Sequence, residues 1–450
     1  MEETIIEIHD FSKKGFGKSK DIPGDILNSI PGEKGKLTKI SGKGKRSLYI
    51  LKELVENSKD RATPRCKHFT SCGGCSLQHV SYERQLRQKQ AKIEELFPDE
   101  TIYPIIGMDD PWHYRGKMEY TFSQNKAKEH FLGLIKPKSK GIVENLTECH
   151  ITHPWFSEVL AIVRSFWENS TLEAYNSYSD TGSLQTLTLR KSVHTNSRMI
   201  TLTVSGNSDF ALTKEQINAF VKAIDDDECA IFIDIKCVSK GSVTRYYEMH
   251  LSGPDFIQEK IGSTSFMMSP KAFFQPNPIM AEKFFTTIRE TLALTGNEKV
   301  LDLFSGIGTI SILLSPYVDH IVAVEIGKEA VCDARVNLDD KNIENVEIYA
   351  DDVSNFIKTR GEHFVPDIVI VDPPRVGIGK VAIEFLEKLG PKVIVYLSCN
   401  PLTQKEDIDN LPSYKISSVR PFDQFPHTPH VENLIFLERI YSAEIQNTII

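Results

Sequence analysis

The sequence has no long hydrophobic run. No stretch of its 450 residues approaches the roughly 18 uncharged apolar residues that a membrane-spanning helix needs. Its first residues, Met1-Glu2-Glu3-Thr4, are acidic and precede no apolar segment, so they do not have the pattern of a signal peptide. We therefore expect a cytoplasmic protein that does not associate with membranes.

Cysteine is scarce, with eight residues in 450, which excludes the disulfide framework of small secreted domains. Internal repeats and low-complexity segments are also missing. The apolar fraction of 40% and the charged fraction of 25% exclude a disordered chain, a collagen and a coiled coil. The length is too great for one compact domain and favours two or three.

The net charge of −8 argues against a nucleic-acid partner, but basic residues are concentrated near the N-terminus. Between Phe11 and Lys52, eleven Lys or Arg stand against three acids, which leaves a local excess of +8. Such a patch is typical of a phosphate-binding module, although a solvated lysine-rich surface is an equal alternative. Short segments with Gly and Pro turns predict an OB-type β-barrel over residues 1–60 that contacts RNA.

The C-terminal part, residues 269–450, alternates β-branched apolar runs with amphipathic stretches. Seven strands are predicted there: Lys299–Phe304, His320–Glu325, Val346–Ala350, Asp367–Val371, Lys392–Leu397, Tyr414–Val419 and Asn433–Arg439. Helical stretches separate the first five, which predicts a doubly wound, mostly parallel α/β sheet with ligands at the carboxyl ends of its strands. Residues 61–268 mix strands and helices and predict a separate, mixed α/β central domain.

A cofactor motif follows the first of these strands. The strand runs into a Gly306-x-Gly308 turn before a helix, and Glu325 ends the next strand, where an acid can accept hydrogen bonds from ribose hydroxyls. The third glycine of a dinucleotide site is replaced by Ser311, and no Lys-Ser/Thr pair of a P-loop follows. S-adenosylmethionine therefore fits better than NAD, and a plain strand–turn with an exposed Glu is the alternative.

Two further strand ends carry reactive residues. Asp372 ends the fourth strand at the cofactor edge, and two prolines follow it. Arg375 then stands where enzymes that methylate base amines usually have an aromatic residue, which argues against that reaction. Cys399 ends the fifth strand and is a candidate nucleophile, because Asn400-Pro401 end the strand at the mouth of the site.

The segment Phe425–Glu432 contains two histidines and a glutamate within six positions. A metal site is one interpretation, but two prolines forbid a helix and the spacing does not suit one strand face. We favour a loop that brings Glu432 to the cleft as a general base.

Taken together, these motifs resemble the RNA uracil-5-methyltransferase family, in the branch that modifies 23S ribosomal RNA and carries an iron–sulfur cluster. The resemblance covers the whole chain and is carried by five blocks in order: Phe273–Asn277, Asp302–Gly308, Asp372–Arg375, Ser398–Pro401 and His430–Glu432. Pro276 stands where the family usually has Val or a similar residue. The resemblance implies six cofactor-contacting residues: Gln275, Phe304, Gly306, Glu325, Asp352 and Asp372.

The resemblance also implies the reaction. It would be S-adenosylmethionine-dependent methylation of uracil C5 in 23S ribosomal RNA, with Cys399 adding to C6 and Glu432 removing the C5 proton. The second cysteine of RNA cytosine-5 enzymes is not found. The N-terminal barrel would be a TRAM domain, with Lys14-Gly15-Phe16-Gly17 in place of its glycine-rich signature. The alternatives are a tRNA uracil-5-methyltransferase, another ribosomal uridine, or a non-catalytic RNA-binding iron–sulfur protein.

Four cysteines are predicted metal ligands: Cys66, Cys72, Cys75 and Cys149. Zinc and a [4Fe–4S] cluster both accept four thiolates, and the spacing favours neither. The four positions match the cluster cysteines of the ribosomal-RNA branch, while the tRNA branch is expected to lack cluster and TRAM domain, so the resemblance favours [4Fe–4S] over zinc. Three other cysteines are interpreted as core residues: Cys229, Cys237 and Cys332. No protein partner is predicted.

Overall fold

The computed structural model describes residues 5–238 and 244–441. The chain divides into two compact units. Unit 1 comprises Met1–Gln85, Asp110–Ile257 and the short segment Pro426–Pro429, and unit 2 comprises Leu86–Asp109, Gln258–Phe425 and His430–Ile450. The predicted domain boundaries at residues 60 and 268 remain predictions.

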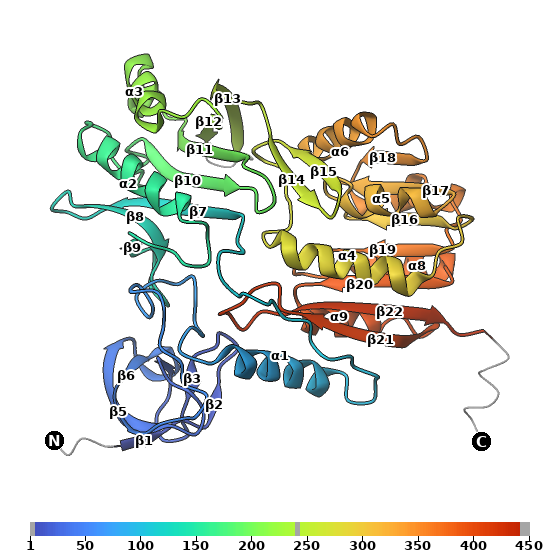
Figure 1. Ribbon diagram of the computed structural model, residues 1–450, viewed down its shortest axis with the longest axis horizontal. Helices are drawn as coiled ribbons and strands as arrows, with labels where there is room; N and C mark the ends of the chain where they lie inside the picture. Colours follow the sequence, from blue (N-terminus) through green and yellow to red (C-terminus); the bar gives the residue numbers. More distant parts are fainter. Residues whose placement is uncertain (1–4, 239–243, 442–450) are drawn as a thin grey trace. The chain divides into compact units, whose positions relative to one another are not determined.

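The N-terminal part of unit 1 is a six-stranded sheet with the order β1-β5-β6-β4-β3-β2. Its strands are β1 (Ile5–Glu7), β2 (Asp10–Phe11), β3 (Gly17–Lys18), β4 (Asp25–Leu27), β5 (Lys34–Ser41) and β6 (Leu48–Glu56). Figure 1 shows the sheet, in blue, curled upon itself. A small core of Ile8, Ile26 and Leu51 holds it together, as expected for a sheet of such short strands.

The rest of unit 1 is built on a seven-stranded sheet with the order β13-β12-β11-β10-β7-β8-β9. Its elements are β7 (Lys117–Gln124), β8 (His130–Ile135), β9 (Val143–Asn145), α2 (Trp155–Glu168), β10 (Leu184–Lys191), β11 (Arg198–Ser205), α3 (Lys214–Ile224), β12 (Cys229–Cys237) and β13 (Arg245–Ser252). Helix α3 begins at a capping box, in which the Thr213 side chain accepts from the Gln216 N–H and the Gln216 side chain accepts from the Thr213 N–H. Phe156, Leu160, Val163 and Trp167 of α2 recur at helical spacing and are buried.

Unit 2 contains the predicted α/β sheet. Its strand order is β18-β17-β16-β19-β20-β22-β21, where β16 to β20 are parallel and β22 pairs antiparallel with both β20 and β21. The strands are β16 (Lys299–Leu303), β17 (His320–Glu325), β18 (Val346–Ala350), β19 (Ile368–Val371), β20 (Val393–Ser398), β21 (Tyr414–Phe422) and β22 (Glu432–Arg439). This confirms the doubly wound fold class (Figure 1).

The α-helices and strands not yet named lie wholly or mostly in unit 2. They are α1 (Tyr82–Leu96), β14 (Ile257–Ile261), β15 (Thr264–Met268), α4 (Pro278–Leu292), α5 (Thr309–Leu314), α6 (Lys328–Asp340), α7 (Val353–Thr359), α8 (Lys380–Leu389) and α9 (Pro401–Ile408). In the part of the chain that the structure describes, no helix is long and apolar enough to cross a lipid bilayer.

The strand order places the site. The chain starts in the middle of the parallel sheet at β16, moves outward to β17 and β18, and then returns to the other side of β16 at β19. Ligands of open α/β sheets bind at this reversal, beyond the carboxyl ends of the strands. The residues that follow β16, β19 and β20 therefore share one edge of the sheet.

Candidate active site

The turn after β16 has a backbone that only some residues adopt easily. Phe304, Gly306 and Gly308 all have positive φ, at 63°, 56° and 73°. A Cβ added to Gly306 would meet no atom within 4 Å, so the space beside this turn is open. The turn thus presents its backbone to a vacant edge of the sheet, as a nucleoside-binding turn must.

Glu325 closes the side of this turn. At the end of β17, its Oε2 accepts a hydrogen bond from the Gly306 N–H at 3.0 Å, and its Oε1 accepts one from the Gly327 N–H at 2.6 Å. Two backbone donors hold the carboxylate in one orientation. This is the placement that the sequence predicted for an acid that accepts from ribose hydroxyls.

The serine that replaces the third glycine has a structural reason. Ser311 donates to Asp302 Oδ2 at 2.6 Å, and Asp302 is fully buried in β16. Burial raises the pKa of Asp302 to about 7, although the Ser311 hydrogen bond opposes the increase. In the sequence Ser311 is visible only as a missing glycine, and no local pattern predicts its bond to Asp302.

Asp372 follows β19 and is hydrogen-bonded to a residue far away in the sequence. Gln275 Nε2 donates to Asp372 Oδ2 at 3.3 Å, so the structure brings these two predicted cofactor residues together. Burial, and then the charge of Asp302, raise the pKa of Asp372, while the Gln275 bond lowers it. Gln275 in turn accepts from Gln424, which the sequence analysis missed.

Cys399 and Glu432 face each other across two strands. β20 and β22 are antiparallel with Ser398 opposite Asn433, so the next step of the same register puts Cys399 opposite Glu432. Glu432 is almost fully buried, at 3% exposure, whereas Cys399 is half-buried. The prediction of a loop at Glu432 was wrong in detail, because Glu432 is the first residue of β22.

The surroundings favour the neutral form of both groups. Burial raises the pKa of Cys399 to about 11, the charges of Glu432 and Asp372 add to the increase, and Arg375 opposes it. Burial also raises the pKa of Glu432 well above its ordinary value, and the charge of Asp372 adds to this. A positive ligand charge beside these groups would oppose these shifts.

Asp352 is placed differently from the other predicted cofactor residues. Its Oδ1 accepts from the N–H groups of Ser354 and Asn355, so Asp352 caps the N-terminus of α7. The side chain is exposed, and this capping role is enough to explain an acid at the position.

The two histidines of the Phe425–Glu432 segment do not form a common site. His427 belongs to unit 1, where its ring stacks on Trp112 at 3.9 Å between centroids and its carbonyl accepts from the N–H groups of Ser76 and Leu77. His430 belongs to unit 2 and contacts the Phe425 ring.

The four predicted metal ligands line one cavity in unit 1, together with His68, Gln78 and Glu148. These ligands are Cys66, Cys72, Cys75 and Cys149, and none of the eight cysteines of the chain forms a disulfide. Burial is the main reason that the pKa of Cys72 rises to about 12, and the charge of Cys149 adds to it. Four thiolates in one buried cavity are therefore unfavourable unless a cationic group neutralises them.

Over residues 5–238 and 244–441, no three or more His, Cys, Asp or Glu side chains are arranged to hold a single metal ion. The interpretation of the remaining cysteines holds only in part: Cys229 is buried, Cys237 is half-buried and Cys332 is exposed, so Cys332 is not a core residue.

Comparison with known proteins supports the same reading of the catalytic unit. Residues 253–440 match the family described as tRNA (Uracil-5-)-methyltransferase. A protein of Protochlamydia amoebophila, named as an uncharacterized RNA methyltransferase, is 38% identical over an alignment that covers 92% of this chain and 98% of that protein. A Clostridium acetobutylicum protein named in the same way is 32% identical, with 97% and 96% covered.

The chain belongs to the RNA uracil-5-methyltransferase family. It is an RNA methyltransferase whose methyl donor is S-adenosylmethionine. Its structure is similar to the Pyrococcus abyssi tRNA (uracil-54, C5)-methyltransferase in complex with S-adenosyl-L-homocysteine, with a TM-score of 0.76, 26% identity, and coverage of 97% of this chain and 100% of that chain. The similarity to a protein named for tRNA thus covers nearly the whole chain. The presence of these domains therefore does not distinguish a ribosomal RNA substrate from a transfer RNA substrate.

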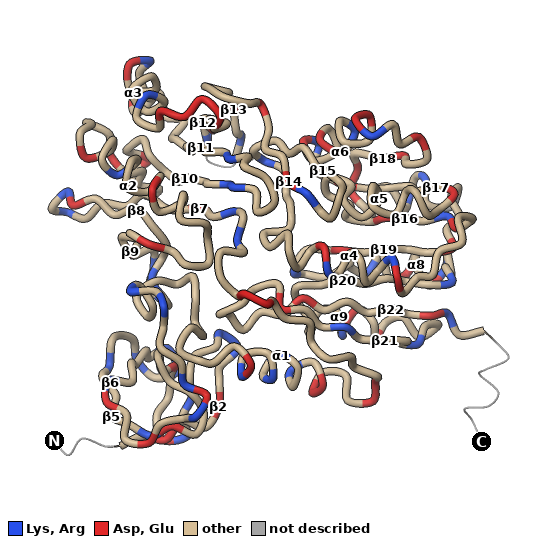
Figure 2. The backbone as a smooth tube through the Cα atoms, in the orientation of Figure 1, with Lys and Arg blue, Asp and Glu red and all other residues tan. Residues whose placement is uncertain are grey.

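The N-terminal sheet of this methyltransferase is less basic than the sequence count suggested. Lys34 pairs with Glu56 at 3.1 Å and Lys36 pairs with Glu53 at 3.1 Å, across β5 and β6. Glu53 and Glu56 lie just outside the segment from Phe11 to Lys52, for which the excess of +8 was counted. Figure 2 shows blue and red segments together on this sheet, so its local charge excess is smaller than +8.

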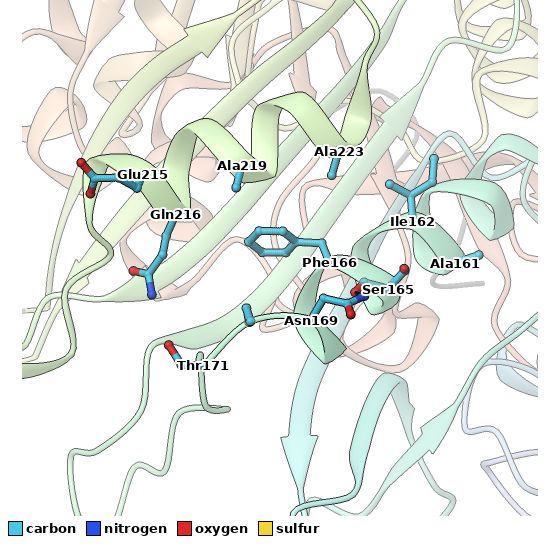
Figure 3. A pocket seen from close by; sticks show the side chains of 11 residues that line it. Ala161, Ile162, Ser165, Phe166, Asn169, Thr171, Glu215, Gln216, Ala219 and Ala223 are labelled. Carbon is cyan, nitrogen blue, oxygen red and sulfur yellow. Dashed lines mark hydrogen bonds between the residues drawn. The ribbon is translucent and has the colours of Figure 1, made fainter.

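A second hollow in unit 1 lies between α2 and α3 (Figure 3). Its walls are mainly apolar or small, and Phe166 projects toward Ala219. Glu215 is its only ionisable lining residue, and none of the predicted site residues lies there. The chemistry of the methyltransferase is therefore assigned to the edge of the unit 2 sheet and not to this groove.

Proposed function

We propose that the protein methylates C5 of uracil in RNA through a covalent adduct between Cys399 and C6. The observation that carries the proposal is the position of Cys399 opposite Glu432 at the carboxyl edge of the sheet. A nucleophile and a buried acid–base group on facing strands can work on the two adjacent ring carbons of a single base.

The reaction begins with the thiol. Uracil C5 is a poor nucleophile, because the ring is an electron-poor enone. Addition of the Cys399 thiolate to C6 forms an S–C6 bond and moves the electron pair of the C5=C6 double bond toward C5 and O4. S-adenosylmethionine supplies an electrophilic methyl group on a positively charged sulfur, which the electron-rich C5 takes.

Glu432 then removes the proton from C5, and the returning electron pair re-forms the double bond and expels the Cys399 thiolate. For this step Glu432 must be ionised, yet its pKa is raised by burial. The positive charge of the bound methyl donor is lost on transfer, so it favours the ionised form of Cys399 for the addition step. Binding of the methyl donor thus activates the Cys399 thiol. A raised pKa makes ionised Glu432 a stronger base for the C5 proton in the last step.

Six residues are proposed to hold the cofactor: Gln275, Phe304, Gly306, Glu325, Asp352 and Asp372. The open space beside Gly306 and the fixed carboxylate of Glu325 support a nucleoside in this position. The exposed helix-cap position of Asp352 gives the weakest support of the six.

The proposed substrate is 23S ribosomal RNA, with a target uridine that is flipped out of its stack to reach Cys399. The N-terminal sheet is proposed to be the TRAM module that contacts this RNA. A tRNA uridine is the second candidate, and the similarity to the Pyrococcus abyssi tRNA enzyme over nearly the whole chain favours it specifically.

The cysteine cavity is proposed to hold a [4Fe–4S] cluster, with zinc as the alternative. Zinc binds thiolates at about 2.3 Å in a tetrahedron, which requires all four sulfur atoms within about 4 Å of one another. The four cysteines line one cavity, which suits either group, so the choice of the cluster rests on the resemblance to the ribosomal-RNA branch. The cluster would fix Cys149 to the loop of the other three and has no part in methyl transfer.

The methylation state of cellular RNA tests the proposal. 5-Methyluridine should be mapped in ribosomal and transfer RNA from cells with and without the protein. Loss of one 5-methyluridine from 23S ribosomal RNA supports the proposal, and loss from transfer RNA establishes the second candidate. Unchanged 5-methyluridine in both classes, with the purified protein inactive on both, would refute the proposed reaction.

A further inference from the structure

Gln424 is a buried residue that the reaction described above does not use. We infer that Gln424 is a positioning residue: through Gln275 it fixes the orientation of the Asp372 carboxylate for the cofactor. This inference rests on the proposed function, because Gln275 and Asp372 are proposed to contact the cofactor.

The contacts form a directed chain of hydrogen bonds. Gln424 Nε2 donates to Gln275 Oε1 at 3.0 Å, and Gln275 Nε2 donates to Asp372 Oδ2 at 3.3 Å. Gln424 is fully buried, whereas Gln275 and Asp372 are partly exposed, so Gln424 acts from behind these two residues.

The donor and acceptor roles set the direction of this chain. An ionised Asp372 can only accept hydrogen bonds, so Gln275 must turn its Nε2 toward it. The Gln275 oxygen then points away and needs a donor, which is the Gln424 amide nitrogen. If Gln424 offered its oxygen instead, two acceptors would face each other, and Gln275 would be driven to reverse its amide.

Gln424 is itself locked from two sides. Asn277 Nδ2 donates to the Gln424 carbonyl at 3.2 Å. The buried Lys89 ammonium donates to Asp423 Oδ1 at 2.5 Å and to the Phe425 carbonyl at 3.0 Å, so it clamps the residues on both sides of Gln424. A buried ion pair has a high desolvation cost, and here it fixes the backbone on both sides of Gln424.

The orientation of the Gln424 side-chain amide is unfavourable for its own oxygen. Gln424 Oε1 is buried and has no hydrogen-bond partner among the residues that the structure describes. Because a buried acceptor without a partner is unfavourable, a purely structural glutamine would be expected to use both ends of its amide. The amide is instead arranged to serve Gln275.

The function of this arrangement lies in the charge of Asp372. The Gln275 bond lowers the pKa of Asp372, against burial and Asp302, which both raise it. Other ionisable groups act in the same region: the charge of Asp372 raises the pKa values of Glu432 and Cys399, and Lys89 contacts Asp423, which precedes Gln424. Release of Gln275 would therefore favour protonated Asp372 and weaken its hold on a positively charged ligand.

The test measures binding of S-adenosylmethionine and S-adenosylhomocysteine by titration calorimetry between about pH 6 and pH 9. Gln424→Met removes the donor to Gln275 and keeps the shape, so the Gln275 amide is no longer held toward Asp372. We expect binding weakened about tenfold, the value of the Gln275 hydrogen bond to the charged Asp372. The KM for the methyl donor should rise while the KM for RNA stays unchanged. Loss of affinity on acidification should begin at a higher pH than in the wild type.

Gln424→Glu should change the pH dependence of ligand affinity in the opposite direction. An ionised carboxylate can only accept, so it turns Gln275 away from Asp372, whereas the protonated form can donate to Gln275 again. The affinity of this variant relative to wild type should therefore recover as the pH falls. This variant decides the question if Gln424→Met fails to fold.

Asn345→Ala is the matched control. Asn345 Nδ2 donates to the carbonyls of Ser315 and Val318 in the same unit and does not contact Gln275. It should lower the melting temperature without changing the affinity or its pH dependence. Affinities and pH profiles of both Gln424 variants equal to wild type would overturn the inference. A wild-type protein that binds neither ligand would instead refute the proposed function.

Discussion

Replacement of Asp302 by Asn should stabilise unit 2 at high pH and destabilise it at low pH. Burial raises the pKa of Asp302 from 3.8 to about 7, so at ~1.36 kcal/mol per pH unit its ionised form is about 4 kcal/mol less favourable in the folded chain than in the unfolded chain. Between these two pKa values the folded chain binds more protons than the unfolded chain. Stability therefore falls as the pH rises through this window.

Asparagine removes this ionisation but introduces another cost. Its oxygen can accept from Ser311 as Asp302 Oδ2 does, but its NH2 replaces Asp302 Oδ1, which has no partner among the described residues. An unsatisfied buried donor costs about 1–3 kcal/mol at any pH. The variant should thus be more stable than wild type by about 1–3 kcal/mol near pH 8.5. Near pH 5, where ionisation of Asp302 costs the folded wild type only about 1.6 kcal/mol, this difference should shift toward the wild type by about 3 kcal/mol, and below the unfolded pKa the variant should be the less stable protein.

The assay is urea unfolding followed by far-UV circular dichroism, using the transition that S-adenosylhomocysteine shifts, since ligand binding marks unit 2. Asp367→Asn is the control on the same sheet, because the Lys392 hydrogen bond lowers the pKa of Asp367 and its contribution is lost as the pH falls. An Asp302→Asn variant with the same stability change at both pH values would refute the reasoning.

Three further predictions concern the reaction and the metal. Cys399→Ala should abolish methylation and leave S-adenosylhomocysteine affinity nearly unchanged in calorimetry, because the thiol contacts the base; residual turnover would contradict its role. Glu432→Gln should allow methyl transfer but stall proton removal, so a covalent enzyme–RNA species should accumulate on denaturing gels with ordinary uracil RNA, and normal turnover would make Glu432 dispensable as the base. Cys72→Ser should remove the brown colour of anaerobically purified protein and weaken folding and RNA binding more than cofactor binding; colourless wild type with one equivalent of zinc and full activity would leave the zinc alternative.

The parallel sheet was predictable because each of its strands is a short apolar run bounded by turn residues. β16, β17 and β18 end within one residue of the sequence prediction. By contrast, β13 was not predicted: its residues Arg245–His250 are exposed on both faces, so the strand shows no alternation of apolar and polar residues. Edge strands such as this one are defined by their pairing partner and not by their own sequence.

In the site, the sequence identified the residues at strand ends but not those that act through other residues. Glu325 and Cys399 stand directly after apolar runs, where a sequence motif reveals them. The Asp302–Ser311 bond and the Gln424–Gln275 bond join residues that no local pattern connects. The charge count near the N-terminus failed for the same reason, because Glu53 and Glu56 neutralise lysines of the neighbouring strand.

The covalent step is the central claim, and 5-fluorouracil RNA tests it most directly. After thiolate addition and methyl transfer, fluorine at C5 cannot leave as a cation, so the adduct cannot resolve. Mass spectrometry of the digested complex should then find a methylated 5-fluorouridine attached to the peptide that contains Cys399. Methylation of ordinary uracil RNA without any such adduct, or an adduct on the exposed Cys332 instead, would contradict the account.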